Sequence, residues 1–183
     1  MKSKMPVSLL IVLLLDLGLV TSVYAVEASK VEKSKQNDLG LYLTSKETHD
    51  YMQKHGAKTL FLDIRDPVEI HTVGMPGGVD YNVAFKFINT KKWDDKQSKF
   101  KLDDNPDFLK DVEARLNAKG LSKDDRIIVI CGSGKRAAKT VNFMAKAGYK
   151  NVYSVVDGYA GWQADKLPWD KKLDRNKIYG NPS

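Results

Sequence analysis

The sequence has few residues that form disulfides or bind metals. One cysteine, Cys131, stands among 183 residues, so the chain cannot form an internal disulfide and has no second thiol to resolve one. The three histidines, His49, His55 and His71, lack the spacing of metal ligands. We therefore expect no metal site and assign these histidines to the surface or to packing. The sequence contains no internal repeat, and its length fits a single domain.

Long hydrophobic runs are also missing. Asp16 follows the apolar run Val7–Leu15, so neither flanking run is long enough to span a bilayer. Two lysines precede the run, and small residues occupy the −3 and −1 positions of a cut after Ala25. Residues 1–25 are therefore predicted to be a signal peptide. We expect an exported protein without a stable membrane anchor, periplasmic if the source is Gram-negative.

Acidic residues are outnumbered by basic ones, which gives a formal net charge of +7 at pH 7. The positive excess is spread among acidic neighbours, so we expect no nucleic-acid partner and a surface that can steer small anions. A hydrophobic content of 42% and a charged content of 29% are ordinary for a soluble globular protein. In an oxidising compartment a lone thiol is a liability unless it is used, which favours a function for Cys131.

The single cysteine lies between a predicted buried strand and a predicted helix. Ile127–Ile130 is a continuous β-branched run, as expected of a parallel strand covered on both faces. The apolar residues after the loop recur at helical spacing, and Gly148 is predicted to end that helix. The apolar residues of that helix are Ala137, Val141, Met144 and Ala147. Cys131 is thereby predicted at the carboxyl end of a strand, just before a helix amino terminus.

That position favours a reactive, anion-binding thiol. Free amide groups and the positive end of a helix dipole favour negative charge. Gly132 and Gly134 allow successive N–H groups to turn inward, and Lys135 and Arg136 add formal positive charge. These effects stabilise a thiolate over a thiol. The alternative is a buried structural cysteine followed by two surface cations.

Three motifs resemble those of the rhodanese (sulfurtransferase) family. The loop Cys131-Gly-Ser-Gly-Lys-Arg136-Ala is similar to its active-site loop, often Cys-x-x-Gly-x-Arg-Ser/Ala. Asp63-x-Arg65 is similar to the pair that follows an early central strand. Asp157-Gly-Tyr-Ala-Gly-Trp162 resembles a late Gly-Gly-x-x-x-Trp pattern, with aspartate at its first glycine. Together the matches cover roughly residues 41–170.

The resemblance implies an α/β fold, a single rhodanese-like domain with a central parallel sheet and helices on both faces. It implies that Cys131 is catalytic and carries a persulfide, and that Asp63 and Arg65 give structural support. It also implies that the rest of the loop binds the substrate or persulfide. Those residues are Gly132, Ser133, Gly134, Lys135 and Arg136.

The activity so implied is transfer of a sulfane sulfur from thiosulfate, or a similar anionic donor, to a thiol or cyanide acceptor, without a cofactor. Two alternatives remain. A non-catalytic member would be a binding, sulfur-carrier or sensor module that docks a partner protein. A phosphatase or arsenate reductase would use the same thiolate, but the ring from Cys131 to Arg136 is one residue shorter than in cysteine phosphatases and the loop contains no acid.

The remaining elements follow from local signals. Polar residues 26–40 are predicted to be a flexible linker, and residues 171–183 a polar tail. A capping box predicts a helix over about 45–54, and Pro106 opens another that ends near Gly120. Further strands are predicted at 58–63, 79–82 and 151–156, and a short helical turn at 67–71.

Residues 85–105 form a predicted insertion in which four aromatic residues alternate with lysines. We expect a long surface excursion whose aromatic side chains pack back onto the domain. The alternative is a lid or docking surface beside Cys131 that places an aromatic and a lysine near the substrate. The aromatic residues are Phe85, Phe87, Trp93 and Phe100.

Overall fold

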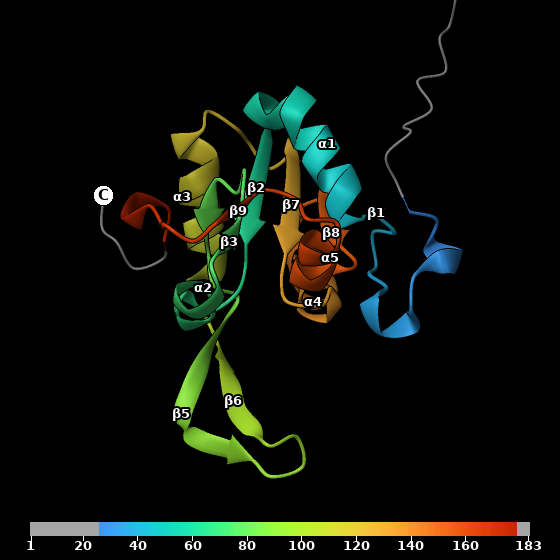
Figure 1. The fold of residues 1–183 in the computed structure, drawn as a ribbon. Coiled ribbons are helices and arrows are strands. Elements are labelled where there is room, and N and C mark those ends of the chain that lie inside the picture. Colours follow the sequence, from blue (N-terminus) through green and yellow to red (C-terminus); the bar gives the residue numbers. More distant parts are fainter. Residues whose placement is uncertain (1–25, 179–183) are drawn as a thin grey trace, which may run out of the picture.

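The computed structural model describes residues 26–178, so the predicted signal peptide and the last five residues of the tail lie outside it. A five-stranded sheet in the order β1-β8-β7-β2-β4 forms the centre, and every pairing in it is parallel (Figure 1). The strands are β1 Tyr42–Leu43, β2 Thr59–Asp63, β4 Tyr81–Asn82, β7 Arg126–Ile130 and β8 Val152–Val155.

Helices cover both faces of this sheet because its central strands are apolar on both sides. On one face the β2 residues Leu60 and Leu62 pack in a core with α3 and α4. On the other face Phe61 packs in a second core with α2 and α5, and α1 lies against it. The helices are α1 Ser45–His55, α2 Pro67–Val73, α3 Phe108–Ala118, α4 Lys135–Lys146 and α5 Gly158–Ala164. The predicted α/β architecture is confirmed.

Local signals placed most of these elements correctly. The capping box at α1 is present: Thr44 Oγ1 accepts a hydrogen bond from the Glu47 amide, and Glu47 accepts one from the Thr44 amide. α2 starts with a second capping box, formed by Asp66 and Glu69 around Pro67. The predicted strand over 79–82 is limited to the last two of those residues.

Short elements complete the described chain. The two-residue strands β3 Met75–Pro76 and β9 Trp169–Asp170 pair antiparallel at one side of the body. Single 3-10 turns are η1 Ala28–Lys30, η2 Lys33–Lys35, η3 Gly56–Lys58 and η4 Arg175–Lys177. Within residues 26–178 no helix is both long and apolar enough to cross a membrane.

The segment 26–40 differs from the flexible linker that its composition predicts. Val31 and Asn37 are buried, and Asn37 Nδ2 donates hydrogen bonds to Ser154 Oγ at 3.0 Å and to the Leu41 carbonyl at 3.1 Å. The Asp38 amide donates to an asparagine of α4 at 2.8 Å. A polar segment is held here because its side chains satisfy buried groups of β8.

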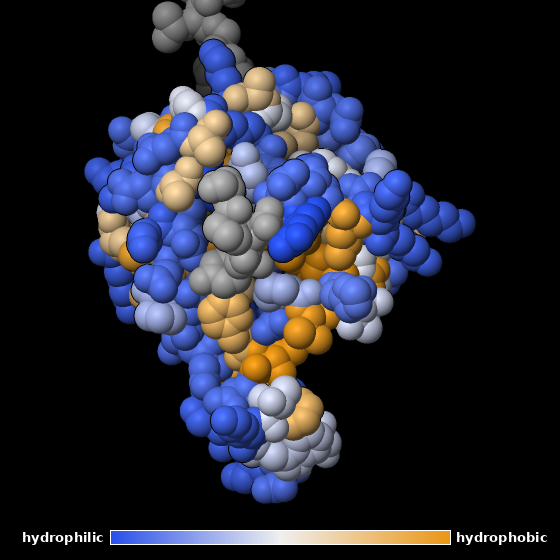
Figure 2. Space-filling model, turned by 90° about the vertical axis from the view of Figure 1, so that its left-hand side faces the viewer, coloured by the Kyte–Doolittle hydropathy of each residue, from blue (hydrophilic) through white to orange (hydrophobic). Residues whose placement is uncertain are grey.

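The insertion forms a β-hairpin that projects from the body (Figures 1 and 2). It consists of β5 Lys86–Asp94 and β6 Lys99–Asp104, which pair antiparallel. The hairpin is tied to α2 because the Asp66 carboxylate caps the Val68 amide with one oxygen and accepts a hydrogen bond from the Ile88 amide with the other, each at 2.7 Å.

Phe87 is partly buried, and the other three aromatic residues of the insertion fall into two groups. Phe85 packs onto the body, with its ring centroid 5.1 Å from that of Phe108. Trp93 and Phe100 remain 49% and 42% exposed and stack edge-to-face on each other at 5.1 Å. The expectation that these aromatics pack back onto the domain therefore holds for Phe85 and is wrong for Trp93 and Phe100, because the hairpin carries the latter two beyond the core.

Candidate active site

Cys131 follows β7 directly, in the tight loop that leads into α4. It is 1% exposed, and its Sγ accepts a hydrogen bond from the Ala137 amide at 3.3 Å. That amide lies in the first turn of α4, where backbone N–H groups have no intrahelical partner. The thiol is thus placed at the positive end of a twelve-residue helix, as the sequence predicted.

The glycines of the loop have different roles. Gly134 is the N-cap of α4 and has a φ of +86°, and a Cβ there would collide with the Val156 carbonyl. Gly132 has open space where a Cβ would lie, and its φ is not positive. Of the two glycines that were expected to let the loop amides turn inward, Gly134 alone adopts a left-handed backbone conformation. The loop is also held from α5, whose Tyr159 amide donates to the Cys131 carbonyl at 2.8 Å.

A pocket of about 350 Å³ opens over the thiol. Five cationic side chains line it, and among the described residues that line it none is acidic. We call it the cationic pocket. Its lining residues are Cys131, Gly132, Ser133, Lys135, Arg136 and Lys139 from the loop and α4, with Lys86, Gln97, Lys99 and Leu102 from the hairpin. Because cations from two separate elements converge beside one sulfur, the pocket suits a small anion.

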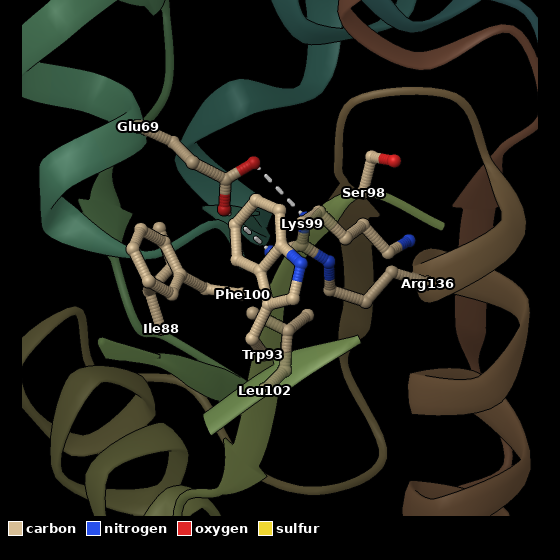
Figure 3. A pocket seen from close by; sticks show the side chains of 8 residues that line it. All are labelled: Glu69, Ile88, Trp93, Ser98, Lys99, Phe100, Leu102 and Arg136. Atoms are coloured by element: carbon tan, nitrogen blue, oxygen red, sulfur yellow. Dashed lines mark hydrogen bonds and ion pairs between the residues drawn. The ribbon is translucent and has the colours of Figure 1, made fainter. Parts of the chain in front are cut away.

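Arg136 is held by a carboxylate that the sequence analysis did not single out. Its Nη1 and Nη2 donate to Glu69 Oε2 and Oε1 at 2.7 and 3.0 Å, a bidentate ion pair (Figure 3). Burial by itself would raise the pKa of Glu69, but the hydrogen bonds and charge of Arg136, with help from the Asp66 amide and Arg65, outweigh it and lower that pKa below its ordinary value. Glu69 therefore stays ionised and fixes the orientation of the guanidinium.

Asp63 and Arg65 form a buried pair of their own. Arg65 Nη2 donates to Asp63 Oδ2 at 2.6 Å and to the Gly74 carbonyl at 2.8 Å. The guanidinium also stacks over the rings of Tyr159 and Trp169, at 5.2 and 5.8 Å from their centroids. Neither residue lines the cationic pocket. These contacts join the end of β2 to α5 and β9, which is the geometry of a structural brace.

A second pocket, of about 400 Å³, lies between the hairpin and the body (Figure 3). We call it the aromatic pocket. The hairpin supplies its apolar side chains, and the Glu69–Arg136 pair forms its polar wall. Its lining residues are Ile88, Trp93, Ser98, Lys99, Phe100, Leu102, Glu69 and Arg136. Lys99, Leu102 and Arg136 line both pockets, so the two are neighbours.

The fold brings together five of the predicted loop residues and adds others. Cys131, Gly132, Ser133, Lys135 and Arg136 line the cationic pocket, whereas Gly134 shapes the turn. The additional cations are Lys86, Lys99 and Lys139. Lys139 follows Lys135 by four positions and so shares its helix face, a signal that the sequence contained. Among residues 26–178, no three His, Cys, Asp or Glu side chains are grouped to hold a metal ion.

Comparison with known proteins identifies the class. The family model of the rhodanese-like domain matches residues 44–165, more than half of the chain. The chain therefore belongs to the rhodanese-like domain family, as its three motifs predicted.

The curated relatives include sulfurtransferases at modest identity. The chain is 30% identical over 108 residues to thiosulfate sulfurtransferase 16, chloroplastic, of Arabidopsis thaliana, which covers 59% of this chain and 77% of the relative. It is 43% identical over 47 residues to thiosulfate sulfurtransferase GlpE of Actinobacillus succinogenes, a match to 26% of this chain and 42% of that protein. Protein RP600 of Rickettsia prowazekii is 30% identical over 115 residues, and the match covers 59% of this chain and 80% of that protein.

Solved structures share the fold. The thiosulfate sulfurtransferase from Pseudomonas aeruginosa matches with a TM-score of 0.52 at 19% identity, covering 78% of this chain and 22% of that one. The Alr3790 protein from Anabaena sp. matches with a TM-score of 0.50 at 17% identity, and the match covers 73% of this chain and 83% of that one. At these identities the likeness bears on the fold alone.

Proposed function

We propose that the protein is a sulfurtransferase that moves a sulfane sulfur from thiosulfate, or a similar anionic donor, to a thiophilic acceptor through a persulfide on Cys131. One observation carries the proposal: the only cysteine of the sequence lies at a helix amino terminus under a pocket lined by five cations. The names of two relatives, both thiosulfate sulfurtransferases, support this donor.

The reaction has two steps. The Cys131 thiolate attacks the outer sulfur of thiosulfate, the S–S bond of the donor breaks, and its electron pair leaves with sulfite, so that Cys131 carries a persulfide anion. Cyanide, or a thiol in the cell, then attacks the outer sulfur of the persulfide and restores the thiolate. Negative charge is present at the sulfur throughout. The first-turn amides of α4 are fixed donors for that charge and need no reorganisation.

The cations have separate roles in the proposal. Lys135, Lys139 and Lys99 attract the donor dianion, because among the described residues none of them has an ion pair closer than 3.8 Å. Arg136 is already paired with Glu69, so it acts as an oriented donor of hydrogen bonds and carries a partly compensated charge. Sulfur transfer of this kind requires no cofactor.

The test is a thiosulfate:cyanide assay on the wild type and on Cys131→Ser, with mass spectrometry of the protein after incubation with thiosulfate. We expect the wild type to turn over and to gain about 32 Da, one sulfur atom. Cys131→Ser should lose activity by at least about 10³-fold and show no adduct. Ser34→Ala is the control because it changes an exposed serine that does not line the cationic pocket and keeps the thiol. Turnover by Cys131→Ser would exclude the persulfide mechanism.

A second candidate function is a non-catalytic carrier, sensor or binding module that docks a partner protein. The exposed Trp93 and Phe100 on the projecting hairpin favour it. Such a module would show no turnover with any small donor in the same assay.

The predicted export of the protein adds a location to this proposal. Residues 1–25 would be removed and the mature chain would begin at Val26. The mass of the protein recovered from a periplasmic fraction tests this, and recovery of the uncut chain from the cytoplasm would contradict it.

A further inference from the structure

Positive charge gathers on one helix of the described chain. α4 contains four basic residues and no acidic one, whereas each of the other α-helices within residues 26–178 holds at least as many acidic as basic residues. In the same part of the chain Lys139 and Lys146 have no ion pair, and Lys135 approaches Glu32 no closer than 3.8 Å. Uncompensated cations on one helix produce a local positive field that attracts acidic surfaces.

These lysines lie on one face of α4 with an exposed aromatic residue among them. We call this row the α4 stripe: Lys135, Lys139, Phe143 and Lys146. Its members are three or four positions apart, so neighbouring side chains adjoin, and all four are exposed. Phe143 is 42% exposed, and its ring centroid is 5.6 Å from that of Phe85 at the base of the hairpin. An apolar side chain surrounded by charged ones is the arrangement of a protein-docking surface.

The α4 stripe begins in the cationic pocket and extends beyond it. Lys135 and Lys139 line that pocket, whereas Phe143 and Lys146 do not. At 1.5 Å per residue, Lys146 lies about 16 Å along the helix from Lys135. A small anion bound beside Cys131 does not span that length, so the whole stripe suits a larger molecule.

The second step of the proposed reaction gives this surface a use. After sulfite leaves, Cys131 carries a persulfide with one negative charge, while Lys99, Lys135 and Lys139 remain around it as cations. Figure 3 shows Lys99 of the hairpin next to Arg136 at the start of α4. The acceptor therefore enters a site with surplus positive charge, which favours a thiol in acidic surroundings over one in neutral surroundings.

We propose that the α4 stripe docks an acidic segment of a partner protein that carries the acceptor thiol to Cys131. This inference rests on the sulfurtransferase activity proposed above. The partner's thiolate attacks the outer sulfur of the persulfide and bonds to it, the S–S bond to Cys131 breaks, and its electron pair restores the Cys131 thiolate. Acidic side chains of the partner lie along Lys139 and Lys146, and an apolar one meets Phe143. Lipid surfaces and nucleic acids present no thiol, which is why the occupant is a protein.

The experiment measures sulfur release from the persulfide to two synthetic peptides of equal length. Each peptide has one central cysteine, flanked by glutamates in one and by glutamines in the other. The protein is loaded with thiosulfate, freed of excess donor and mixed with either peptide, and the loss of about 32 Da follows the reaction. We expect Lys146→Glu to lower the rate constant about three- to tenfold for the acidic peptide. For the neutral peptide, for cyanide and for mercaptosuccinate, a small thiol with two carboxylates, the change should be less than twofold.

Lys171→Glu is the matched control for the change in charge. Lys171 is exposed, and its neighbours Trp169 and Leu173 pack against the core on the opposite face of the sheet from α4. Comparing variants with the same acceptor cancels the intrinsic reactivity of that acceptor. Lys146→Gln should act in the same direction with a smaller loss. Equal losses in Lys146→Glu and Lys171→Glu, or equal losses for mercaptosuccinate and the acidic peptide, would overturn the inference, because they would report a general field and no docking.

Binding separates the docking surface from the activity. Calorimetry uses the acidic peptide with serine in place of its cysteine, so no sulfur is transferred. Binding that weakens in Lys146→Glu and not in Lys171→Glu supports the surface even if thiosulfate forms no persulfide, in which case the sulfurtransferase proposal fails by itself. Turnover with cyanide, without binding of the acidic peptide, would remove the docking surface and leave the activity. Binding to phosphatidylglycerol vesicles or to RNA but not to the acidic peptide would also overturn the inference.

Discussion

At the scale of single residues, the charge of the candidate site depends on Glu69. Cys131 and the loop cations were evident from the sequence, but the guanidinium of Arg136 is shared with a carboxylate 67 positions away. The pair is partly exposed, so its contribution to stability is small, about 1 kcal/mol. Its larger effect is on the field that an anionic donor meets at the pocket mouth.

Replacing Glu69 with glutamine should strengthen donor binding. Gln retains the capping hydrogen bond at α2, so the helix is preserved, while a negative charge beside the cationic pocket is removed. We expect the KM for thiosulfate to fall about two- to fivefold, the effect of one partly screened charge. Steady-state kinetics at low ionic strength checks this. A higher KM would mean that Glu69 is needed to aim Arg136 at the donor.

The pH dependence of stability provides the control for that variant. The pKa of Glu69 is lowered in the folded protein, so its ion pair stabilises the fold above the ordinary glutamate pKa, 4.5, and this stability is lost as pH falls through the lower folded value. The difference in unfolding free energy between wild type and Glu69→Gln should be constant from about pH 8 to about pH 5 and vanish in more acidic solution. Urea denaturation at several pH values measures it.

At the scale of elements, the turn between β7 and α4 depends on one glycine. Gly134 needs a left-handed φ and lies against the backbone of Val156, while Gly132 has neither constraint. The close approach of the loop to the end of β8 is what aims the amino terminus of α4 at the sulfur.

A pair of glycine variants tests this assignment. Gly134→Ala should destabilise the fold by about 3 kcal/mol or more, because it combines backbone strain with a collision against a carbonyl. Gly132→Ala should change stability by less than about 1 kcal/mol. Thermal unfolding of both proteins gives the comparison. Equal losses would mean that the loop is not shaped by the turn at Gly134.

At the scale of the whole molecule, the body folds around two cores and the hairpin lies outside both. The sheet residues alternate between the two cores, and the far half of the hairpin, from Lys92 to Lys99, contributes no residue to either. Figure 2 shows the hairpin as a lobe below the body. An appendage of this kind affects what reaches the site more than whether the protein folds.

Deletion of Lys92–Lys99 should separate folding from donor binding. The melting temperature should fall by no more than about 4 °C, because the two cores are untouched. The KM for thiosulfate should rise several-fold, because Lys99 leaves the cationic pocket. Calorimetry and steady-state kinetics measure the two effects. An unchanged KM would show that the hairpin takes no part in binding this donor.

The sequence by itself determined what local chemistry controls. The buried run at β7, the capping box at Thr44 and the Cys131–Arg136 loop each depend on neighbours within a few positions, so their patterns predict strand, helix start and thiol environment directly. The loop, its position between a strand and a helix, and the two further motifs at Asp63–Arg65 and Asp157–Trp162 together indicated the family.

The tertiary structure decided what joins distant positions. The Glu69–Arg136 pair, the lysines of the hairpin beside Cys131 and the docking of Asn37 on Ser154 all depend on strand order and on the direction of the insertion. Composition predicted a flexible linker at residues 26–40, because polar segments usually stay in solvent. It also predicted that the aromatic residues of the insertion pack on the core, because aromatic side chains are usually buried. Which surface each one meets is set by packing over long sequence separation, and no local pattern encodes that choice.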